Sequence, residues 1–420
     1  MKTSLFAGLL ILAGVFAPTY AETNNFEVGG QIRHRYQADD RAFSDPRYLT
    51  FNQLRSRLNV KYKVSNDITG FVQFQDSRRF GEMASTIDGS ANQIDLHQGF
   101  IQVNDFFFNW LDAKAGRMSV NYGNQRLVGA LEWHNVARSF DGLIFTPWAG
   151  KHSIDLFYFV IRDSLRRSDQ GNFNFFGFNA NIYTSERYTN QVYLMWQRQN
   201  PSTDLNRWTI GFYSNGRLGN FYHFTEFAYQ GGDITPDTTR NDVQAYFGTI
   251  SLGWKDVGER GYKPDARIGV DFLSGDDNLG DDKYRVFDTL YATNHKFYGF
   301  MDYFLNIPRD TFGRGLIDAH IRATIAPAEK TKTQLAFHYF RSHRSVVLSD
   351  DSRSKAFGSE LDLTLVYQYD AKLNITCGAS VFFPGAIFKD FPSVFDKLGG
   401  RDRGGDRTTA WFYIMTTLTI

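Results

Sequence analysis

Six basic side chains occupy positions of one parity in two neighbouring segments near the N-terminus. They are Arg33, Arg35, Arg55, Arg57, Lys61 and Lys63, with Glu27 as the one acid in the same pattern. Arginine binds planar carboxylates through two parallel hydrogen bonds, and a wall of low dielectric constant strengthens each contact. If both segments are strands, the six cations share one face and concentrate anions there. The alternative is that any charge on a membrane barrel strand must face the lumen, whatever is transported.

Arg117 is a further candidate, and it shares its parity with the polar residues Ser119 and Asn121. The sequence therefore predicts that Arg117 points into the polar interior, where it could bind a substrate. An ion pair with Asp141 would instead give Arg117 a structural role.

Arg126 and Arg138 lie in the connection that follows. Gly123 and Gly129 allow this connection to fold tightly. We therefore expect it to dip toward a pore and to bring both arginines near the narrowest point. Pairing with Glu132 is the structural alternative.

Other charged groups point less clearly to a function. The wall opposite the basic segments contains Asp318, Glu360 and Asp362, so a transverse field is an alternative to a uniformly positive pore. The loop Gly275–Asp282 offers oxygen ligands for Ca²⁺, but it lacks the spacing of a helix–loop–helix calcium site, and a solvated acidic loop is the preferred interpretation. With the single cysteine, Cys377, no disulfide framework or multi-cysteine metal site can form.

Enzyme motifs are missing from the sequence. It contains no G-x-S-x-G nucleophile elbow, no phosphate loop and no H-E-x-x-H motif. A barrel hydrolase built on His97, His320 or His338 is a minor alternative, because a lone histidine is more often a polar lumen residue. We expect no enzyme activity, no metal and no cofactor.

The elements that position these residues alternate with a period of two. Apolar and polar residues take opposite parities in seven segments: Phe26–Tyr36, Leu54–Val64, Ser153–Val160, Gln191–Gln199, Asp265–Phe272, Leu316–Ile325 and Glu360–Tyr369. Side chains alternate across a strand, so each segment has one apolar and one polar face. A soluble sandwich also alternates, but these segments have the length of tilted transmembrane strands.

Aromatic residues cluster at the ends of the segments, as in the girdles of membrane barrels. Those that we assign to the girdles are Tyr36, Tyr62, Trp148, Trp196, Trp254 and Trp411. The chain has 16% aromatic residues, 22% charged residues and one cysteine. Together these features predict an all-β fold, a single transmembrane antiparallel β-barrel of about 18 strands.

Three of the candidate strands are ambiguous: Asp95–Val103, Asn220–Gln230 and Phe297–Leu305. The last strand is Thr409–Ile420, and a closed barrel must pair it with Phe26–Tyr36. The polar stretches expected to form external loops or lumen plugs are Ala38–Thr50, Arg79–Gln93, Asn124–Arg138, Gly231–Asp242, Ser274–His295, Ser342–Lys355 and Ala386–Arg407.

The first 21 residues resemble a secretory signal peptide. Lys2 is followed by an apolar run, Leu5–Ala17, and by small residues at the −3 and −1 positions, Thr19 and Ala21. We therefore expect two parts, a signal peptide at 1–21 and an outer-membrane β-barrel at 22–420, with a Gram-negative outer membrane as the location. Without Lys2 the chain has 45 basic and 45 acidic residues, which argues against a general nucleic-acid binder.

Two stretches resemble the alginate-export family of outer-membrane proteins. The first runs from Gly116-Arg117 through Tyr122-Gly123-Asn124-Gln125-Arg126 and Trp133-His134-Asn135 to Arg138-Ser139-Phe140-Asp141-Gly142. The second contains Phe287-Asp288, Leu290-Tyr291, Thr293-Asn294-His295-Lys296-Phe297 and Gly299. The resemblance implies an 18-stranded barrel with an arginine-lined, anion-selective lumen, and it makes Arg117, Arg126 and Arg138 candidate constriction residues. This chain has no excess of basic residues, in contrast to what the resemblance implies for the lumen.

The expected function is thus a passive outer-membrane channel for an anionic polysaccharide or oligosaccharide, such as an alginate-like uronate. A general or small-anion porin is the alternative, and a barrel enzyme or an adhesin is less favoured. Expected partners are the sugar, outer-membrane lipid and lipopolysaccharide, and periplasmic export proteins.

Overall fold

The structure is a computed structural model. It describes residues 25–43, 49–80, 94–163, 171–200, 204–235, 239–256, 258, 261–278, 280–390 and 404–420. The expected signal peptide, 1–21, lies outside these residues, and so do most of the polar stretches Arg79–Gln93 and Ala386–Arg407. No helix in the described ranges has the length and apolar character needed to cross a membrane.

The described chain is almost entirely strands. Their bounds are β1 (Phe26–Asp40), β2 (Leu49–Lys63), β3 (Ile68–Phe80), β4 (Asp95–Val103), β5 (Leu111–Met118), β6 (Phe140–Ala149), β7 (His152–Arg162), β8 (Asn172–Ser185), β9 (Tyr188–Asn200), β10 (Leu205–Leu218), β11 (Phe221–Ile234), β12 (Asn241–Lys255), β13 (Asp265–Leu273), β14 (Lys283–Tyr284), β15 (Leu316–Ile325), β16 (Thr331–Val347), β17 (Arg353–Gln368), β18 (Leu373–Pro384) and β19 (Thr409–Thr419). The short helices are η2 (Asn294–Lys296), α2 (Ile307–Asp310) and α3 (Ala386–Asp390).

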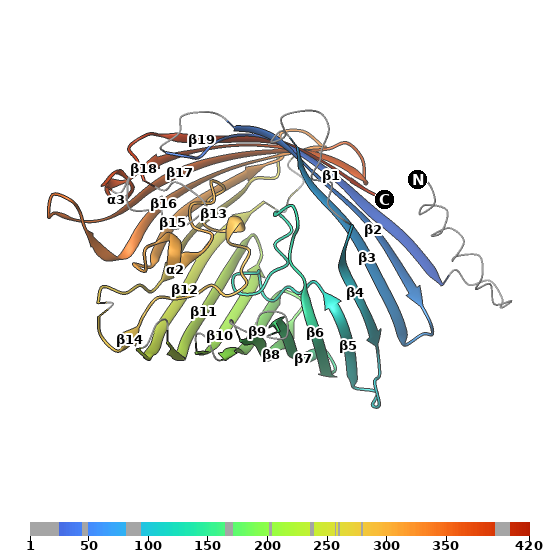
Figure 1. Cartoon of the computed structure of the whole chain (residues 1–420). Helices are drawn as coiled ribbons and strands as arrows, with labels where there is room; N and C mark the ends of the chain where they lie inside the picture. The colour runs from blue at the N-terminus through green and yellow to red at the C-terminus, as the bar shows by residue number, and fades with distance from the viewer. Residues whose placement is uncertain are drawn as a thin grey trace, which may run out of the picture.

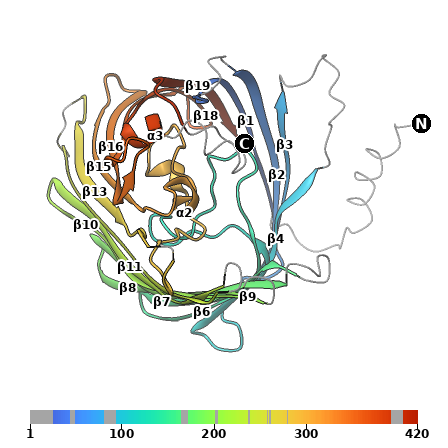
Figure 2. The ribbon, with the colours of Figure 1, turned by 60° about the vertical axis from the view of Figure 1, so that its left-hand side comes forward.

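Eighteen of these strands form a closed antiparallel barrel (Figures 1 and 2). Each strand pairs with its neighbour in sequence, except that β13 pairs with β15 across the short strand β14, which adds in parallel to β12. The barrel closes between β1 and β19, from Gln31 opposite Thr419 to Asp40 opposite Ala410. The predicted fold class, strand number and closing pair are confirmed.

Of the three ambiguous segments, two are strands. The segment Asp95–Val103 is β4, and Asn220–Gln230 falls almost wholly in β11. The third, Phe297–Leu305, is not a strand; it belongs to the connection between β13 and β15 and lies inside the barrel. Its aromatic residues are buried against the lumen wall, and a buried apolar segment cannot be distinguished from a core strand by composition alone.

The two faces of the barrel follow the alternation of the sequence. On β17, for example, Leu361, Leu363 and Leu365 are 40–46% exposed on the outer surface, whereas Glu360 and Asp362 face inward and are buried. Trp196 lies on the outer surface as expected, because it is opposite Phe176, which is opposite the exposed Tyr158. Trp148 does not share this face, because it is opposite Ser153 on the inward parity of β7. The girdle assignment of Trp411 is wrong: its side chain is 2% exposed, and its indole nitrogen donates to Gln37 in the lumen.

The barrel has two unlike ends. At one end, here called the turn end, strands are joined by short connections such as Gly150–Lys151 and Gly219–Asn220. The other end, here called the loop end, carries the longer connections. Two of these fold into the barrel, namely 119–139, here called the first lumen loop, and 274–315, here called the second lumen loop; Figure 2 shows both inside the ring of strands.

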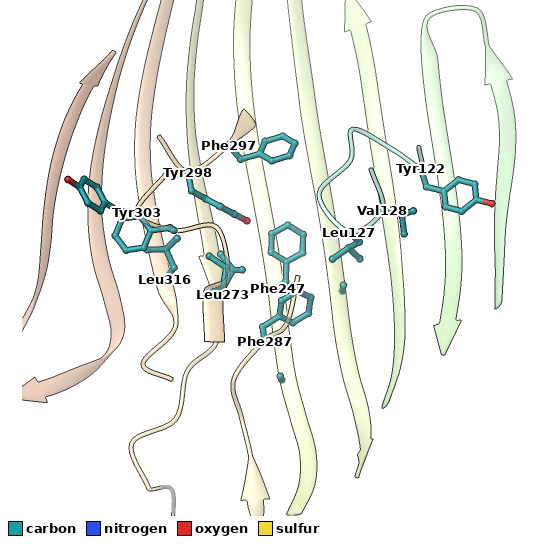
Figure 3. Packing of buried hydrophobic residues seen from close by; sticks show 14 of the residues in the cluster. Tyr122, Leu127, Val128, Phe247, Leu273, Phe287, Phe297, Tyr298, Tyr303 and Leu316 are labelled. Atoms are coloured by element: carbon teal, nitrogen blue, oxygen red, sulfur yellow. The ribbon is translucent and has the colours of Figure 1, made fainter. Parts of the chain in front are cut away.

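The two lumen loops contact each other. Val128 and Tyr291 form a parallel β-bridge, and the backbone NH of Gly129 donates to the carbonyl of Tyr291. A Cβ atom at Gly129 would lie 2.4 Å from Thr293 Oγ1, so only glycine permits this approach. Aromatic and aliphatic side chains of both loops pack on the inner face of β12, β13 and β15, which forms an apolar core inside the barrel (Figure 3).

Candidate functional site in the barrel lumen

The arginines predicted on the N-terminal wall hold the first lumen loop. Arg33 donates to the carbonyls of Glu132 (2.6 Å) and His134 (3.2 Å). Arg55 donates to the same two carbonyls at 3.1 and 3.3 Å. Both guanidinium groups are nearly fully buried and have lost their hydrating water. These hydrogen bonds compensate for that loss.

Glu132 completes this attachment. Its carboxylate accepts from Arg57 Nη1 at 2.9 and 3.1 Å and lies 3.0 Å from Arg55 Nη2. Burial would raise the pKa of Glu132, but the charges of Arg57 and Arg55 hold it below its usual value. Arg33, Arg55 and Arg57, which we predicted to bind anions, therefore contact the first lumen loop instead.

Arg35 contributes to a stack of rings that crosses between the two lumen loops. Its guanidinium carbon lies 4.1 Å from the ring centre of Trp133. Trp133 in turn stacks on His295, with centroids 4.2 Å apart and planes at 7°, and His295 stacks on Phe300 at 5.0 Å. His295 Nδ1 lies 2.5 Å from an oxygen of Asp302.

The stack lies between two cavities. The loop-end cavity, of about 490 Å³, is lined by Arg35, Trp133 and His295 together with residues of β1 and β2. The turn-end cavity, of about 460 Å³, is lined by the same Trp133 and His295 together with Arg322 and Lys332. Trp133 and His295 therefore mark the boundary between the two compartments of the lumen.

Lys61 lies near the turn end of the same wall. Its ammonium nitrogen is 3.2 Å from Glu27, which Lys63 also contacts at 3.1 Å. These three side chains are 38–54% exposed, so the pairs are screened by solvent.

The predicted orientation of Arg117 is wrong. Arg117 lies directly opposite Asp141, which lies opposite Val160. Opposed residues share a face, and Val160 belongs to the exposed apolar surface of β7, so Arg117 points outward. It forms an ion pair with Asp141 at 2.7 Å. The inward residue is Met118; polar neighbours misled the parity assignment because β5 ends there and the chain leaves the sheet.

Arg126 lies inside the barrel and is buried. Its Nη1 is 2.9 Å from Asp271 Oδ2 on β13 and donates to the hydroxyl of Tyr298 at 3.3 Å, and its guanidinium lies over the ring of Phe297 at 4.1 Å. Burial alone would lower the pKa of Arg126, but Asp271 holds it above its usual value. Arg126 thus fixes the first lumen loop to the far wall.

Arg138 connects the two lumen loops. Its Nη1 donates to the carbonyls of Gly129 (2.9 Å), Ala292 (3.3 Å) and Tyr291. Burial lowers the pKa of Arg138 to about 10.

Three cations that the sequence did not single out face the lumen beyond the stack. Arg267 and Arg322 lie directly opposite each other on β13 and β15, and Lys296 comes from the second lumen loop. We call these three residues the cation triad. Lys296 and Arg322 line the same cavity, with Arg267 opposite Arg322. Burial lowers the pKa of Lys296, and the like charges of Arg126, Arg267 and Arg322 lower it further. Among the described residues, no carboxylate lies within ion-pair distance of the triad.

The carboxylates on the wall opposite the basic segments are buried. Asp318, Glu360 and Asp362 are each at most 1% exposed, and Glu360 accepts from the backbone NH of Met301 in the second lumen loop at 2.8 Å. In the acidic loop, Asp276 and Asp281 both pair with Arg285, at 3.2 and 2.8 Å. These carboxylates therefore face protein groups more than the open lumen.

Comparison with solved structures identifies porin-like neighbours. The chain is similar to Pseudomonas aeruginosa OccK11 (OpdR), with 11% identity, a TM-score of 0.57 and coverage of 94% of this chain and 96% of that chain. It is similar to Acinetobacter baumannii OccAB4, with 8% identity, a TM-score of 0.60 and coverage of 94% and 98%. For Pseudomonas aeruginosa OpdK, solved with vanillate, the values are 10%, 0.58, 95% and 100%. At these identities the likeness shows the fold alone.

A comparison with curated protein sequences gave no significant match. A family model described as alginate export matches residues 24–395, which is most of the chain. The barrel is thus that of an outer-membrane channel, as the sequence predicted, and the chain belongs to the alginate export family.

Proposed function

We propose that this channel passes carboxylated sugars, such as uronate oligosaccharides, passively across the outer membrane. The observation that carries the proposal is the cation triad, Arg267, Arg322 and Lys296, on the lumen side of the barrel wall. The three charges have no carboxylate within ion-pair distance in the described chain, so their mutual repulsion is relieved when an anion lies between them.

The position of the triad favours transit over permanent binding. Arg322 and Lys296 line the turn-end cavity, and short turns of such barrels face the periplasm. A carboxylate that reaches this cavity meets the guanidinium of Arg322, which can bind it in bidentate fashion, and the ammonium of Lys296. Arg267 lies directly opposite Arg322 on the neighbouring strand. The nearby carboxylates of Asp318 and Asp362 reduce the net field, which favours release.

Two features support this substrate class: the family to which the chain belongs and the side chains that line the lumen. The alginate export family supports a uronate polymer or oligomer, and the lumen offers cations beside the aromatic rings of Trp133 and Tyr413. Sugar rings have apolar faces that pack on aromatic side chains, so an acidic sugar matches both features. We assign Arg33, Arg35, Arg55, Arg57, Arg126 and Arg138 to positioning the lumen loops, with the triad as the substrate-facing group.

Planar-bilayer recording tests the proposal. Arg267→Gln and Arg322→Gln should each move the reversal potential toward cation selectivity at low salt, where screening is weakest, and should weaken block by uronate oligomers. Arg117→Gln is the matched control, because it removes one arginine from the outer surface and should change neither property. If both triad variants keep the selectivity and the block of the parent, the triad does not select the solute.

A small-anion porin is the second candidate. The observation that favours it is the ring stack of Trp133 and His295 between two cavities of under 500 Å³ each, which suits small solutes. Anion selectivity that depends on the triad, without block by uronate oligomers, would support this alternative over the polysaccharide channel.

A further inference from the structure

A cluster of metal-ligand side chains lies in the lumen wall, apart from the cation triad. His320 on β15 and His338 on β16 are directly opposite each other, and Asp318 precedes His320 by two residues on the same face. One ligand atom from each of the three residues can be chosen so that all lie within 4.8 Å of one another. All three side chains are buried, at 0–6% exposure.

The spacing matches a small coordination sphere. Asp318 Oδ2 lies 2.8 Å from His338 Nδ1 and 3.6 Å from His320 Nδ1. Ligands about 2.0–2.1 Å from a tetrahedral zinc ion are about 3.3–3.4 Å apart, which falls between these two distances. A cation between the three atoms would replace the proton that Asp318 and His338 share.

The charge around the cluster is a second, independent observation. Glu360 lies opposite His338, and Asp362 lies opposite Ala336, so three buried carboxylates face the same patch of wall. Among the described residues, no hydrogen bond reaches Asp318 Oδ1, His320 Nδ1, Glu360 Oε2 or Asp362 Oδ2. Buried charge of one sign is costly unless it is paired or coordinates a metal. Arg322 is the one cation on this face of β15, and the carboxylates outnumber it.

We propose that Asp318, His320 and His338 bind one divalent transition-metal ion, with Zn²⁺ as the best match to two imidazoles and one carboxylate. The neighbouring Glu360 would not be a ligand, but its carboxylate and that of Asp318 together would balance the two positive charges of the ion. His320 and Arg322 are neighbours on the inner face of β15, and Arg322 lines the turn-end cavity, so the site borders that cavity.

Such an ion would join β15 to β16 directly beneath the second lumen loop. Glu360 accepts from the backbone of Met301, so the site lies one side chain away from the loop that fills the lumen. The proposal does not depend on what the channel transports.

The test is a titration of the full refolded barrel, purified without a histidine tag, with Zn²⁺ and with Co²⁺ as a spectroscopic probe. The parent should bind one ion per chain and give the intense visible absorption of cobalt in a low-coordination site. His320→Gln should weaken binding at least about 10-fold, because loss of one of three ligands removes a coordinate bond. His223→Gln, which changes a histidine of β11 bonded to Ser214, should leave the affinity unchanged.

Two results would overturn the proposal. One is a parent barrel with no saturable Zn²⁺ or Co²⁺ binding, in which case the three side chains are a hydrogen-bonded cluster only. The other is binding that His320→Gln and Asp318→Asn leave unchanged, which would assign the ion to another place. Should Asp318→Asn fail to fold, His320→Gln and the parent still decide the question, because the Asp318–His338 pair remains intact in both.

Discussion

The indole of Trp133 lies flat against the imidazole of His295, with ring centres 4.2 Å apart and planes at 7°. The two residues come from different lumen loops, far apart in the sequence, and each lines both cavities. Tyr413 on β19 meets the indole edge-on at 5.0 Å. The pair is therefore held by groups from the barrel wall as well as by its own stacking.

Truncation of this ring should open the lumen. Trp133→Ala removes the indole that divides the two cavities, so we expect a higher single-channel conductance. Trp196→Ala is the control, since Trp196 lies on the outer surface, where it stacks on Phe176, and its loss leaves the lumen unchanged. Equal conductance of Trp133→Ala and the parent would mean that solutes pass elsewhere in the barrel.

The attachment of the first lumen loop should depend on pH. Arg57 and Arg55 lower the pKa of Glu132 below its usual value of 4.5. The ion pairs therefore stabilise the docked loop at pH values above 4.5, and this contribution is lost as the pH falls through the lowered pKa. Current through the parent should become noisier on acidification in that range as the loop detaches. Glu132→Gln should be noisy already at neutral pH and should show no such acid transition.

The buried pair of Arg126 and Asp271 should be costly to break from one side. Asp271→Asn leaves a buried guanidinium without its counter-charge, and we expect a loss of about 3–5 kcal/mol in the free energy of unfolding. The double variant Arg126→Met/Asp271→Leu removes both charges and should lose much less. Urea unfolding in lipid vesicles measures both, and equal losses for the two variants would contradict the pairing.

Gly299 sets the approach of the second lumen loop to the wall. Its φ is +79°, and a Cβ atom there would lie 2.5 Å from Glu360 Oε1. Gly299→Ala should therefore displace the loop at a cost of about 1–3 kcal/mol. Limited proteolysis should cut this variant faster within 274–315 than the parent. Gly150→Ala, also at positive φ but with open space around it, is the control for backbone strain alone.

The barrel could be predicted from the sequence because side chains alternate between the two faces of a strand. In a membrane barrel one face meets lipid, so alternate residues differ clearly in polarity. Leu361, Leu363 and Leu365 alternate with Glu360 and Asp362 because one face meets lipid and the other meets the lumen. The length of the segments distinguishes this pattern from that of a soluble sandwich. Closure between the first and last strands followed from the same physics, since lipid leaves no backbone edge unpaired.

The lumen was harder to predict because it depends on contacts between distant segments. The parity of Arg33 and Arg55 revealed the inner face, but nothing local indicated that backbone carbonyls of the first lumen loop would occupy both guanidinium groups. Arg267 and Arg322 have the polar parity of recognised strands, so a search for cations opposite each other on neighbouring strands could have found them. Lys296 needed the path of the second lumen loop, which has no periodic signal.

The first lumen loop is fixed to the barrel at two places that are far apart in the order of synthesis. Arg33 and Arg55 of β1 and β2 hold Glu132, whereas Arg126 of the loop pairs with Asp271 of β13. If the strands pair in chain order, the loop is present before β13 joins the sheet, and Arg126 lacks its partner Asp271 until then. In that order of assembly the first lumen loop is held by β1 and β2 alone until β13 is added, so the passage takes its final width only late in assembly.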